Sequence, residues 1–227
     1  MGKDEKNYLA LKKFCVEGGA DLFGVADIKE IRKEFKLSQE TLKRLDWGIS
    51  LGINVSGAIL EEITEEPTRL YFHHYRTVNF FLDQLALRAA GFIQRKGFAA
   101  LAIPASLILD WENHRGHLSH KKIAVSAGLG WIGRNNLLVN KEFGSQFRLV
   151  SILTDMPLKA DKSLKGGGCG ECRLCIKACP AGAIKEEFLE FDYVKCFEKL
   201  NEFQKKRMVD QYICGVCVNA CRGRGYA

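Results

Sequence analysis

The sequence predicts a mixed α+β core at residues 1–158, followed by a smaller cysteine-rich module at residues 159–227. Two observations support this division. Apolar segments with the periodicities of strands and of helices alternate in the first part, without the strict βαβ rhythm of a parallel sheet. Eight of the nine cysteines lie between Cys169 and Cys221, after a lysine- and glycine-rich linker at residues 159–168.

The first elements of the core follow from local patterns. Helical spacing of apolar residues predicts an amphipathic helix at residues 8–18, which a glycine pair ends. A continuous apolar run predicts a buried strand at residues 21–26. Helical patterns follow at residues 28–35 and 38–45, and Ser38 is suited to cap the second of them.

The remaining core elements are longer. Small and apolar residues predict a second strand at residues 49–59, and an apolar stripe predicts one long helix at residues 68–97. A short strand is expected at residues 98–103, before a proline. Residues 137–140 and 146–154 have the pattern of a β-hairpin with a glycine at its turn.

The first cysteine motif has the spacing C-x-x-C-x-x-C-x-x-x-C-P and comprises Cys169, Cys172, Cys175, Cys179 and Pro180. This is the run of bacterial two-cluster ferredoxins, in which three thiolates hold one [4Fe–4S] cluster and the fourth reaches the other. Two intervening residues let the chain wrap one cubane, and the longer last step starts a helix that carries the fourth thiolate away. The proline fixes the turn that follows.

The second half of the ligand set is Cys196 followed by a C-x-x-C-x-x-x-C motif. We expect a ferredoxin-like module with two [4Fe–4S] clusters, in which the last cysteine of each motif binds the cluster of the other motif. One cluster would be held by Cys169, Cys172, Cys175 and Cys221, and the other by Cys179, Cys196, Cys214 and Cys217. The alternatives are zinc sites, structural thiols or clusters without redox activity, but zinc prefers paired CxxC elements separated by a loop. Cys15 is left over and is expected to be a small core residue.

The chain carries a formal net charge of +7 and has a pI of about 8.9. A basic surface suits RNA, an acidic partner protein or an anionic cofactor, or it offsets the negative charge of thiolate-bound clusters. No apolar stretch reaches the ~18 residues of a membrane span, and no apolar segment of a signal peptide follows the N-terminus. We therefore expect a cytoplasmic protein that does not contact a membrane.

A glycine-rich turn, GLGWIG at residues 128–133, precedes the cysteines. Such a turn lets the backbone approach a flat ligand closely. The same pattern occurs in phosphate-binding Rossmann turns, but here no clear strand precedes it and no acidic residue follows about 20 positions later. A packing turn without a ligand is the third interpretation.

The order of the motifs resembles the epoxyqueuosine reductase and reductive dehalogenase superfamily. AGLGWIG, LLV, EFG, LTDMPL and the two cysteine motifs occur in the same order over residues 68–221. The resemblance implies a nitroreductase-like α/β core that binds cobalamin, with one cluster near the corrin. By the same resemblance, the expected corrin neighbours are Gly128, Leu129, Gly130, Trp131, Ile132, Gly133 and Asn135.

Two features differ from epoxyqueuosine reductases. Those enzymes carry an aspartate proton donor in an Asp-Ser-Ala-Pro-like stretch before the glycine motif, whereas residues 103–106 are Ile-Pro-Ala-Ser. They also continue into a helical-repeat domain that helps to bind tRNA, whereas this sequence stops soon after Cys221. Both differences weigh against epoxyqueuosine as the substrate and leave tRNA as an alternative partner only.

Reductive chemistry needs a proton donor close to the reacting centre. The candidates are Tyr75, Asp110 and His114, with His117 and His120 as further histidines of the same region. The superfamily also carries a tyrosine at the place of Tyr75, whereas Asp110 and His114 lie in the stretch that replaces the aspartate. Each of them is also common as a surface or capping residue.

The function expected from these features is that of a cobalamin- and [4Fe–4S]-dependent oxidoreductase. A ferredoxin or flavodoxin-type donor would supply electrons through both clusters to cobalt, and the substrate would be a small molecule or a corrinoid protein. The first alternative is an electron-transfer or corrinoid-reducing partner without a substrate of its own. The second is a two-cluster protein with a flavin or no further cofactor.

Overall fold

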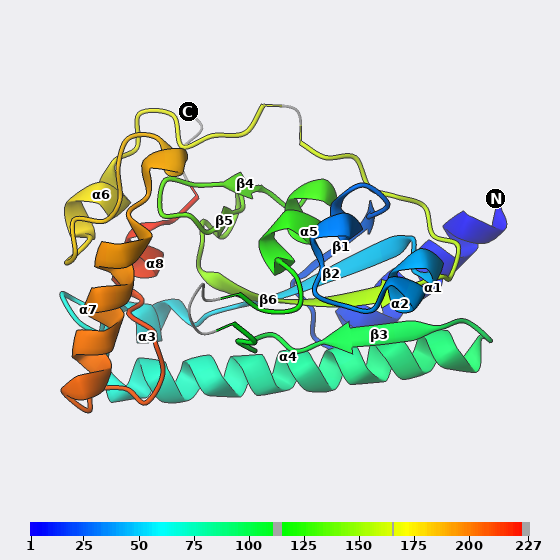
Figure 1. Cartoon of the computed structure of the whole chain (residues 1–227), viewed down its shortest axis with the longest axis horizontal. Coiled ribbons are helices and arrows are strands. Elements are labelled where there is room, and N and C mark those ends of the chain that lie inside the picture. The colour runs from blue at the N-terminus through cyan, green and yellow to red at the C-terminus, as the bar shows by residue number, and fades with distance from the viewer. Residues whose placement is uncertain (111–114, 165, 224–227) are drawn as a thin grey trace. The chain divides into compact units, whose positions relative to one another are not determined.

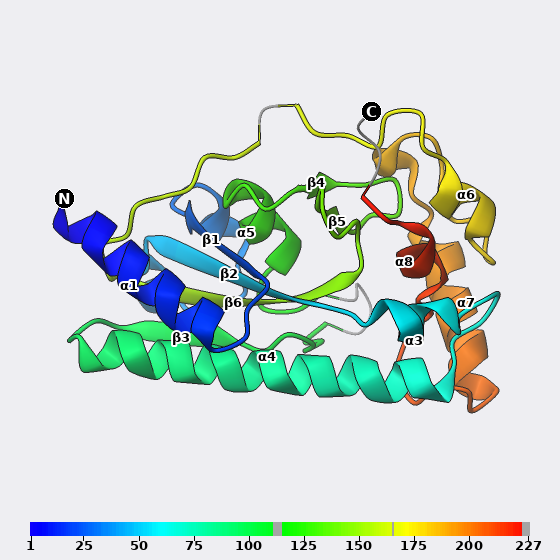
Figure 2. The same cartoon turned by 180° about the vertical axis from the view of Figure 1, so that it is seen from behind.

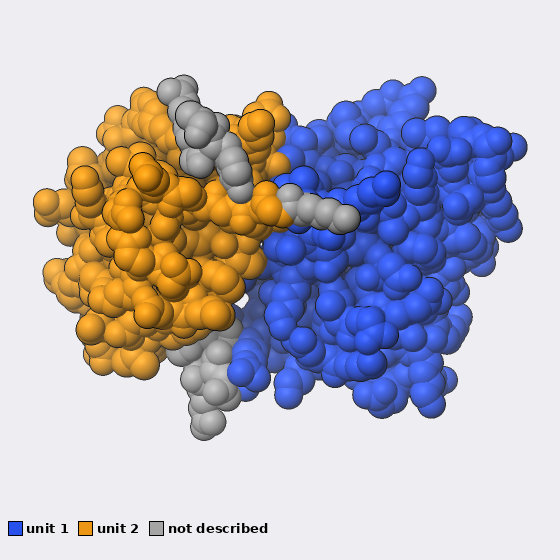
Figure 3. All heavy atoms as spheres, turned by 90° about the horizontal axis from the view of Figure 1, so that it is seen from above, with its two compact units in different colours: residues 1–53, 79–129, 148–165 blue, residues 54–78, 130–147, 166–227 orange. Residues whose placement is uncertain are grey.

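The computed structural model describes residues 1–110, 115–164 and 166–223. The chain forms two compact units, each built from three segments (Figure 3). Unit 1 comprises residues 1–53, 79–129 and 148–165, and unit 2 comprises residues 54–78, 130–147 and 166–227. The units therefore do not follow the single boundary after residue 158 that the sequence predicted, because two earlier segments fold with the cysteines.

Unit 1 is organised around a four-stranded sheet with the order β1-β2-β6-β3 (Figure 1). Its strands are β1 (Leu22–Asp27), β2 (Trp47–Asn54), β3 (Ala100–Ile103) and β6 (Phe147–Thr154). β1 and β2 are antiparallel, and so are β3 and β6. Five of the six residues of β1 are buried, as the apolar run predicted.

Helices lie on both faces of this sheet. On one face, Tyr8 of α1 (Lys3–Glu17) meets Phe23 of β1 edge-on, and Phe14 of α1 stacks on Phe92 of α4 (Arg69–Arg95) with ring centroids 4.8 Å apart. Figure 2 shows the unit 1 part of α4 running alongside the sheet. Successive side chains of a strand point to opposite faces, so Gly24 points away from Phe23.

The other face carries α5 (His120–Ser126), with η1 (Ile31–Glu34) and α2 (Gln39–Arg44) beside it. A Cβ on Gly24 would lie 2.8 Å from the Ala127 carbonyl oxygen, and a Cβ on Gly48 would lie 2.7 Å from Ile28. Glycine on these strands therefore allows the helical layer to approach the sheet backbone closely. The predicted Ser38 cap is confirmed, because its hydroxyl accepts a hydrogen bond from the Thr41 N–H.

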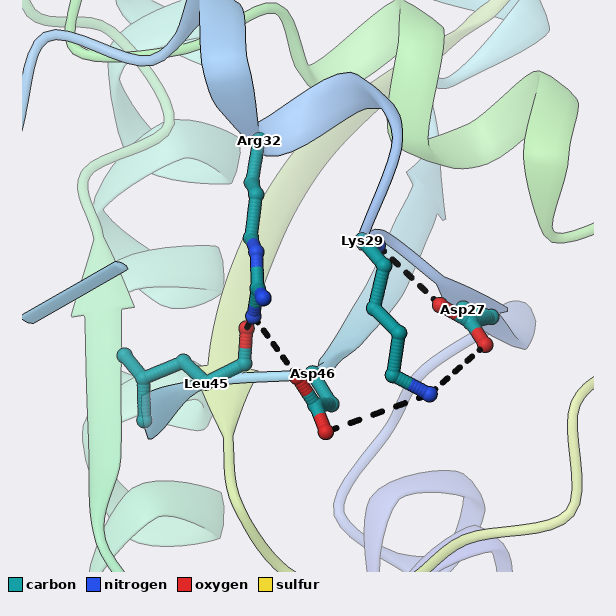
Figure 4. Close-up of polar contacts among 5 residues, drawn as sticks. All are labelled: Asp27, Lys29, Arg32, Leu45 and Asp46. Carbon is teal, nitrogen blue, oxygen red and sulfur yellow. Dashed lines mark hydrogen bonds and ion pairs between the residues drawn. The ribbon is translucent and has the colours of Figure 1, made fainter. Parts of the chain in front are cut away.

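A group of charged side chains ties the segment after β1 to the start of β2 (Figure 4). Arg32 donates to the Leu45 carbonyl at 3.0 Å and to the Asp46 carboxylate at 2.6 Å. The Lys29 ammonium lies 3.2 Å from Asp27 and 3.9 Å from Asp46. Exposed pairs of this kind contribute at most ~1 kcal/mol each, so they mainly fix the course of the loop.

Unit 2 is mostly helical. Besides the first turns of α4, it contains the short elements α3 (Gly57–Glu61), β4 (Trp131–Ile132), β5 (Leu138–Val139), α6 (Leu174–Ala178), η2 (Phe188–Glu190), α7 (Tyr193–Lys205) and α8 (Val216–Ala220). Its core includes Val55, Leu60, Tyr71, Phe203 and Val216, which come from the first and the last of its three segments.

Three predictions about elements need correction. Residues 137–140 and 146–154 do not form a hairpin, because β5 pairs with β4 and β6 pairs with β3. Alternation of apolar and polar residues identifies a strand but not its partner. The second strand ends at Asn54 and gives way to α3, and residues 28–35 form only the single 3₁₀ turn η1.

Among the described residues, no helix combines the length and the apolar character that crossing a bilayer requires.

Candidate functional site

The first cysteine run is a turn followed by one short helix. The Cys172 N–H donates to the Cys169 carbonyl at 3.0 Å, and α6 places Cys175 in its first turn. The Cys179 N–H donates to the Cys175 carbonyl at 3.1 Å, and Cys179 itself has extended backbone angles. The chain therefore leaves the helix at the fourth cysteine, as the sequence motif predicted.

The second cysteine run lies on α7 and around α8. Cys196 is on α7, Cys217 is on α8, and Cys214 and Cys221 flank α8. Gly215 has a φ of +87° at the start of α8, and a Cβ there would lie 2.6 Å from the ring of a core tyrosine, so glycine is required. α6 and α8 pack against each other, which brings the two runs together within unit 2.

The thiols of the first predicted set influence one another. Burial raises the pKa of the Cys175 thiol to about 12, and the neighbouring thiolates of Cys221, Cys169 and Cys172 add to this rise. The structure thus brings together the four cysteines that the sequence assigned to one cluster, although they are separated by up to three helices along the chain.

The second predicted set behaves in the same way. Burial raises the pKa of the Cys217 thiol well above its ordinary value, and Cys214, Cys196 and Cys179 contribute charge repulsion. Burial also raises the pKa of Cys214 and of Cys196 to about 11. Cys217 is affected by Cys175 as well, so the two sets adjoin. The assignment of each thiolate to a particular cluster stays a prediction.

The donor set suits iron–sulfur clusters. Burial raises the pKa of the Cys175, Cys214 and Cys217 thiols, and a metal ion would supply the positive charge that a thiolate needs in a dry environment. In a cubane each cysteine binds a different iron, so four ligands surround a larger body than a single ion. In residues 1–110, 115–164 and 166–223, no three His, Cys, Asp or Glu side chains converge on one metal ion.

Hydrogen bonds hold Cys221, the last ligand of the first set. The Ser145 hydroxyl and the backbone N–H groups of Ser145 and Gly223 donate to its sulfur, and they oppose the rise in the Cys221 pKa that burial causes. The Ser145 N–H also lies 3.3 Å from the Cys221 carbonyl oxygen. Asn135 donates its amide N–H to the Ser145 hydroxyl oxygen at 3.0 Å, and both side chains are buried.

Arg134 fastens the loop between Cys169 and Cys172. Its guanidinium donates to the carbonyl oxygens of Gly170 at 2.9 Å, Cys172 at 3.0 Å and Glu186 at 2.6 Å. Only 14% of the Arg134 side chain is exposed. Planar guanidinium groups are suited to such multiple contacts, because their N–H donors point in fixed directions.

The glycines of the GLGWIG turn all contact other parts of the chain. A Cβ on Gly128, whose φ is +72°, would lie 2.3 Å from the Lys162 carbonyl oxygen, and one on Gly130 would lie 2.1 Å from the Val139 carbonyl oxygen. A Cβ on Gly133 would lie 2.5 Å from the Val139 side chain and 3.4 Å from a cysteine sulfur. These contacts match the packing interpretation of the turn and leave the corrin contacts of the glycines a prediction.

The other predicted corrin neighbours also have identified neighbours in the chain. Leu129 packs beside Gly24, Trp131 packs against Gly167, and Ile132 pairs with Leu138 in the small sheet. The amide of Asn135 is engaged with Ser145, as described above. The sequence assigned these residues to a cofactor, and the structure shows what each of them does within its own unit.

Tyr75 and Asp110, two of the predicted proton donors, belong to different units. Tyr75 is 8% exposed and belongs to the core of unit 2, where its ring lies 6.2 Å from that of Tyr71. Asp110 belongs to unit 1 and forms a two-way backbone bridge with Arg115. His114 lies outside the described residues. His117 bonds through Nδ1 to the Lys36 carbonyl.

His120 is held in one tautomer beside a small cavity in unit 1. Its Nε2–H donates to the Pro104 carbonyl at 3.0 Å, which leaves Nδ1 to accept from the Ser151 hydroxyl at 2.8 Å. Burial lowers the pKa of His120 to about 4, so the imidazole is neutral at pH 7. The cavity has a volume of about 200 Å³ and is lined by residues 103–108, residues 116–118 and His120.

Comparison with known proteins supports the prediction of iron–sulfur clusters. Residues 168–223 match the family model described as a 4Fe-4S double cluster binding domain. Over 113 residues the chain is 36% identical to the epoxyqueuosine reductase of Leadbetterella byssophila, a match that covers 46% of this chain and 36% of that protein. It is 44% identical to the Escherichia coli epoxyqueuosine reductase over 68 residues, covering 30% of this chain and 18% of that one.

These matches support the resemblance of this chain to the epoxyqueuosine reductase and reductive dehalogenase superfamily.

Two solved structures show the extent of the shared fold. The catabolic reductive dehalogenase NpRdhA superposes with a TM-score of 0.75 at 19% identity, covering 96% of this chain and 32% of that one. Epoxyqueuosine reductase from Streptococcus thermophilus superposes with a TM-score of 0.64 at 21% identity, covering 96% of this chain and 66% of that one. The chain spans about a third of the length of the curated relatives it matches.

The sequence analysis did not identify two residues of this site, Arg134 and Ser145. Arg134 directly follows the glycine motif, and Ser145 directly follows the EFG motif. Their positions beside superfamily motifs were the available signal. Gly170, a partner of Arg134, lies 36 residues further along the chain, and Cys221, the partner of Ser145, lies further still. No local pattern in the sequence therefore reveals these contacts.

Proposed function

We propose that this chain is a cobalamin-dependent iron–sulfur reductase. The observation that supports the proposal is that eight cysteines lie together within unit 2, over the segment that matches a double-cluster model. Two adjoining clusters suit the transfer of single electrons from a donor protein to a second redox centre.

Cobalamin is the second centre that the relatives favour. One reductive dehalogenase structure with this fold is described as suggesting a mechanism for B12-dependent dehalogenation. Bound cobalamin would supply a metal ion that accepts electrons from the clusters and reduces the substrate. Because the glycines of the GLGWIG turn face other parts of the chain, we expect this segment to contribute backbone and side-chain contacts rather than open glycine surfaces.

The partners follow from the same proposal. The electron donor would be a ferredoxin or flavodoxin-type protein. The substrate would be a small molecule or a corrinoid protein, and tRNA is the less favoured alternative because residues 103–106 contain no aspartate. The excess of basic over acidic residues falls in unit 1, whereas unit 2 has nearly equal numbers. The basic charge is therefore better placed to attract an anionic ligand to unit 1 than to offset the clusters.

Anaerobic reconstitution tests the proposal in two stages. The full chain, supplied with iron and sulfide, is expected to hold about eight irons per chain. Cobalamin is then titrated in and followed by absorbance and EPR spectroscopy, and saturable binding with a base-off Co(II) signal is the expected result. Unchanged spectra at high cobalamin concentration would exclude the cofactor, and an iron content near zero would exclude the clusters.

The second candidate function is an electron-transfer or corrinoid-reducing partner without a substrate of its own. The observation that favours it is the position of Tyr75, the best-supported proton donor, in the hydrophobic core of unit 2. A Tyr75→Phe variant separates the two functions. It would abolish turnover by a substrate-reducing enzyme, but it would leave the rate of electron delivery to an added corrinoid protein unchanged.

A further inference from the structure

Arg134 brings a positive charge to the backbone of the first ligand loop. Its three hydrogen bonds end on Gly170 and Cys172, inside the C-x-x-C turn, and on Glu186. The Glu186 carboxylate also pairs with Arg134 at 3.5 Å and with Arg173 at 2.6 Å. The three side chains carry a net charge of one positive unit, and Arg134 is the better shielded arginine, with 14% of its side chain exposed against 48% for Arg173.

Ser145 acts on the same predicted cluster from its other end. Its hydroxyl and its N–H both donate to the sulfur of Cys221. The Asn135 amide donates to the hydroxyl oxygen at 3.0 Å, so the hydroxyl hydrogen is directed to the sulfur and not to Asn135. All these groups belong to unit 2, and they come from the segment between β4 and β6.

We propose that Arg134 and Ser145 are positioning residues that raise the reduction potential of the cluster held by Cys169, Cys172, Cys175 and Cys221. The inference rests on the proposed binding of two clusters. Reduction adds one electron to a [4Fe–4S]²⁺ cluster and forms [4Fe–4S]⁺, with the electron coming from the donor protein and no proton transferred. The added negative charge is stabilised by a nearby cation and by hydrogen bonds to a ligand sulfur.

The second predicted cluster serves as an internal reference. Its ligand Cys214 accepts a hydrogen bond from the Val216 N–H and is influenced by the Lys199 ammonium. Neither Arg134 nor Ser145 bonds to residues 179, 196, 214 or 217 through the contacts described above. A change at Arg134 or Ser145 should therefore shift one potential and leave the other in place.

The test is an EPR-monitored redox titration of the reconstituted full chain. Arg134→Gln and Ser145→Ala are the test variants, and Arg173→Gln is the matched control, since it removes a positive charge from the same ion-pair group without touching the Cys172 carbonyl. We expect either test variant to lower the equilibrium constant for reduction of one cluster by about threefold to tenfold, which is up to about 59 mV for a one-electron couple. Arg173→Gln should shift it less, because its charge is more exposed to solvent.

Iron content keeps the two proposals distinguishable. A wild-type chain that binds no iron overturns the proposed function itself. If the wild type and Ser145→Ala both hold about eight irons but have the same two potentials, the tuning role is wrong. Equal shifts of both potentials, or a control shift as large as that of Arg134→Gln, also overturn it. Loss of about four irons from Arg134→Gln alone supports its positioning role, and Ser145→Ala then decides the effect on potential.

Discussion

Replacing Gly144 by alanine tests how the fourth ligand of the first predicted cluster is placed. Gly144 has a φ of +60°, and an added Cβ would lie 2.0 Å from the Cys221 carbonyl oxygen and 2.6 Å from the Gly223 nitrogen. The turn around Gly144 is closed by hydrogen bonds in both directions with Asn140. The glycine therefore allows this turn to lie directly against the backbone of the ligand.

The expected magnitude has two parts. An alanine in the left-handed region costs roughly 1–2 kcal/mol of folding free energy. Side-chain carbons do not approach other atoms within 3.0 Å, so the Cys221 carbonyl must also move by at least about 1 Å. Metal–ligand distances tolerate only about 0.2 Å, so a ligand displaced this far no longer supports its cluster. Gly144→Ala should then lose the first cluster and retain the second.

The assay is iron content after anaerobic reconstitution, together with thermal unfolding. The matched control is Gly182→Ala, because Gly182 has a φ of +57° and no neighbour within 4 Å of an added Cβ. Both variants should lose the same roughly 1–2 kcal/mol from backbone strain. Only Gly144→Ala should fall from about eight irons to about four. Eight irons in both variants, with equal stability, would refute the reasoning.

Three further outcomes follow from buried polar and thiol groups. The His120 pKa of about 4 lies below the ordinary 6.5, so between these pH values the unfolded chain binds a proton that the folded chain does not. The free energy of unfolding should therefore fall by ~1–2 kcal/mol from pH 6.5 to pH 4.5. His120→Gln should reduce this fall, which urea unfolding at both pH values measures. Asp161 accepts hydrogen bonds from the Val25 N–H at 2.8 Å and from the Tyr8 hydroxyl at 2.9 Å. Asp161→Asn should therefore lower the free energy of unfolding by ~1–2 kcal/mol, and an unchanged urea midpoint would contradict this role. Cys15 is fully buried in unit 1, so Cys15→Ala should keep about eight irons, whereas a loss of four would show that it is a ligand.

Local signals made much of the fold predictable. The long amphipathic stripe gave α4 to within two residues at each end, and the Ser38 cap gave the start of α2. The first cysteine run contains its own turn and helix, because its ligands are three and four residues apart. In each case the interactions that decide the structure are made within a few residues, which is the range that periodicity and capping describe.

Pairing over longer separations was not predictable. β6 pairs with β3, which lies about 50 residues earlier in the chain, and the sequence of neither strand identifies its pairing partner. The same limit explains the missed roles of Arg134 and Ser145, because Gly170 lies 36 residues after Arg134 and Cys221 lies beyond α8. The eight cysteines could be predicted as ligands because their spacing in the sequence is a known signature, whereas the residues that hydrogen-bond to them follow no such spacing.

The GLGWIG turn offers a decisive test between packing and cofactor contact. A Cβ on Gly130 would lie 2.1 Å from the Val139 carbonyl oxygen, so Gly130→Ala should destabilise the chain even without any cofactor. Gly57→Ala is the control in the same unit, because Gly57 is the first residue of α3 and an added Cβ there has no neighbour within 4 Å. Thermal unfolding of the cofactor-free chain should give a lower midpoint for Gly130→Ala than for the wild type, and an equal or higher one for Gly57→Ala. If Gly130→Ala unfolds like the wild type and loses only cobalamin binding, the glycine serves the cofactor and the packing explanation is wrong.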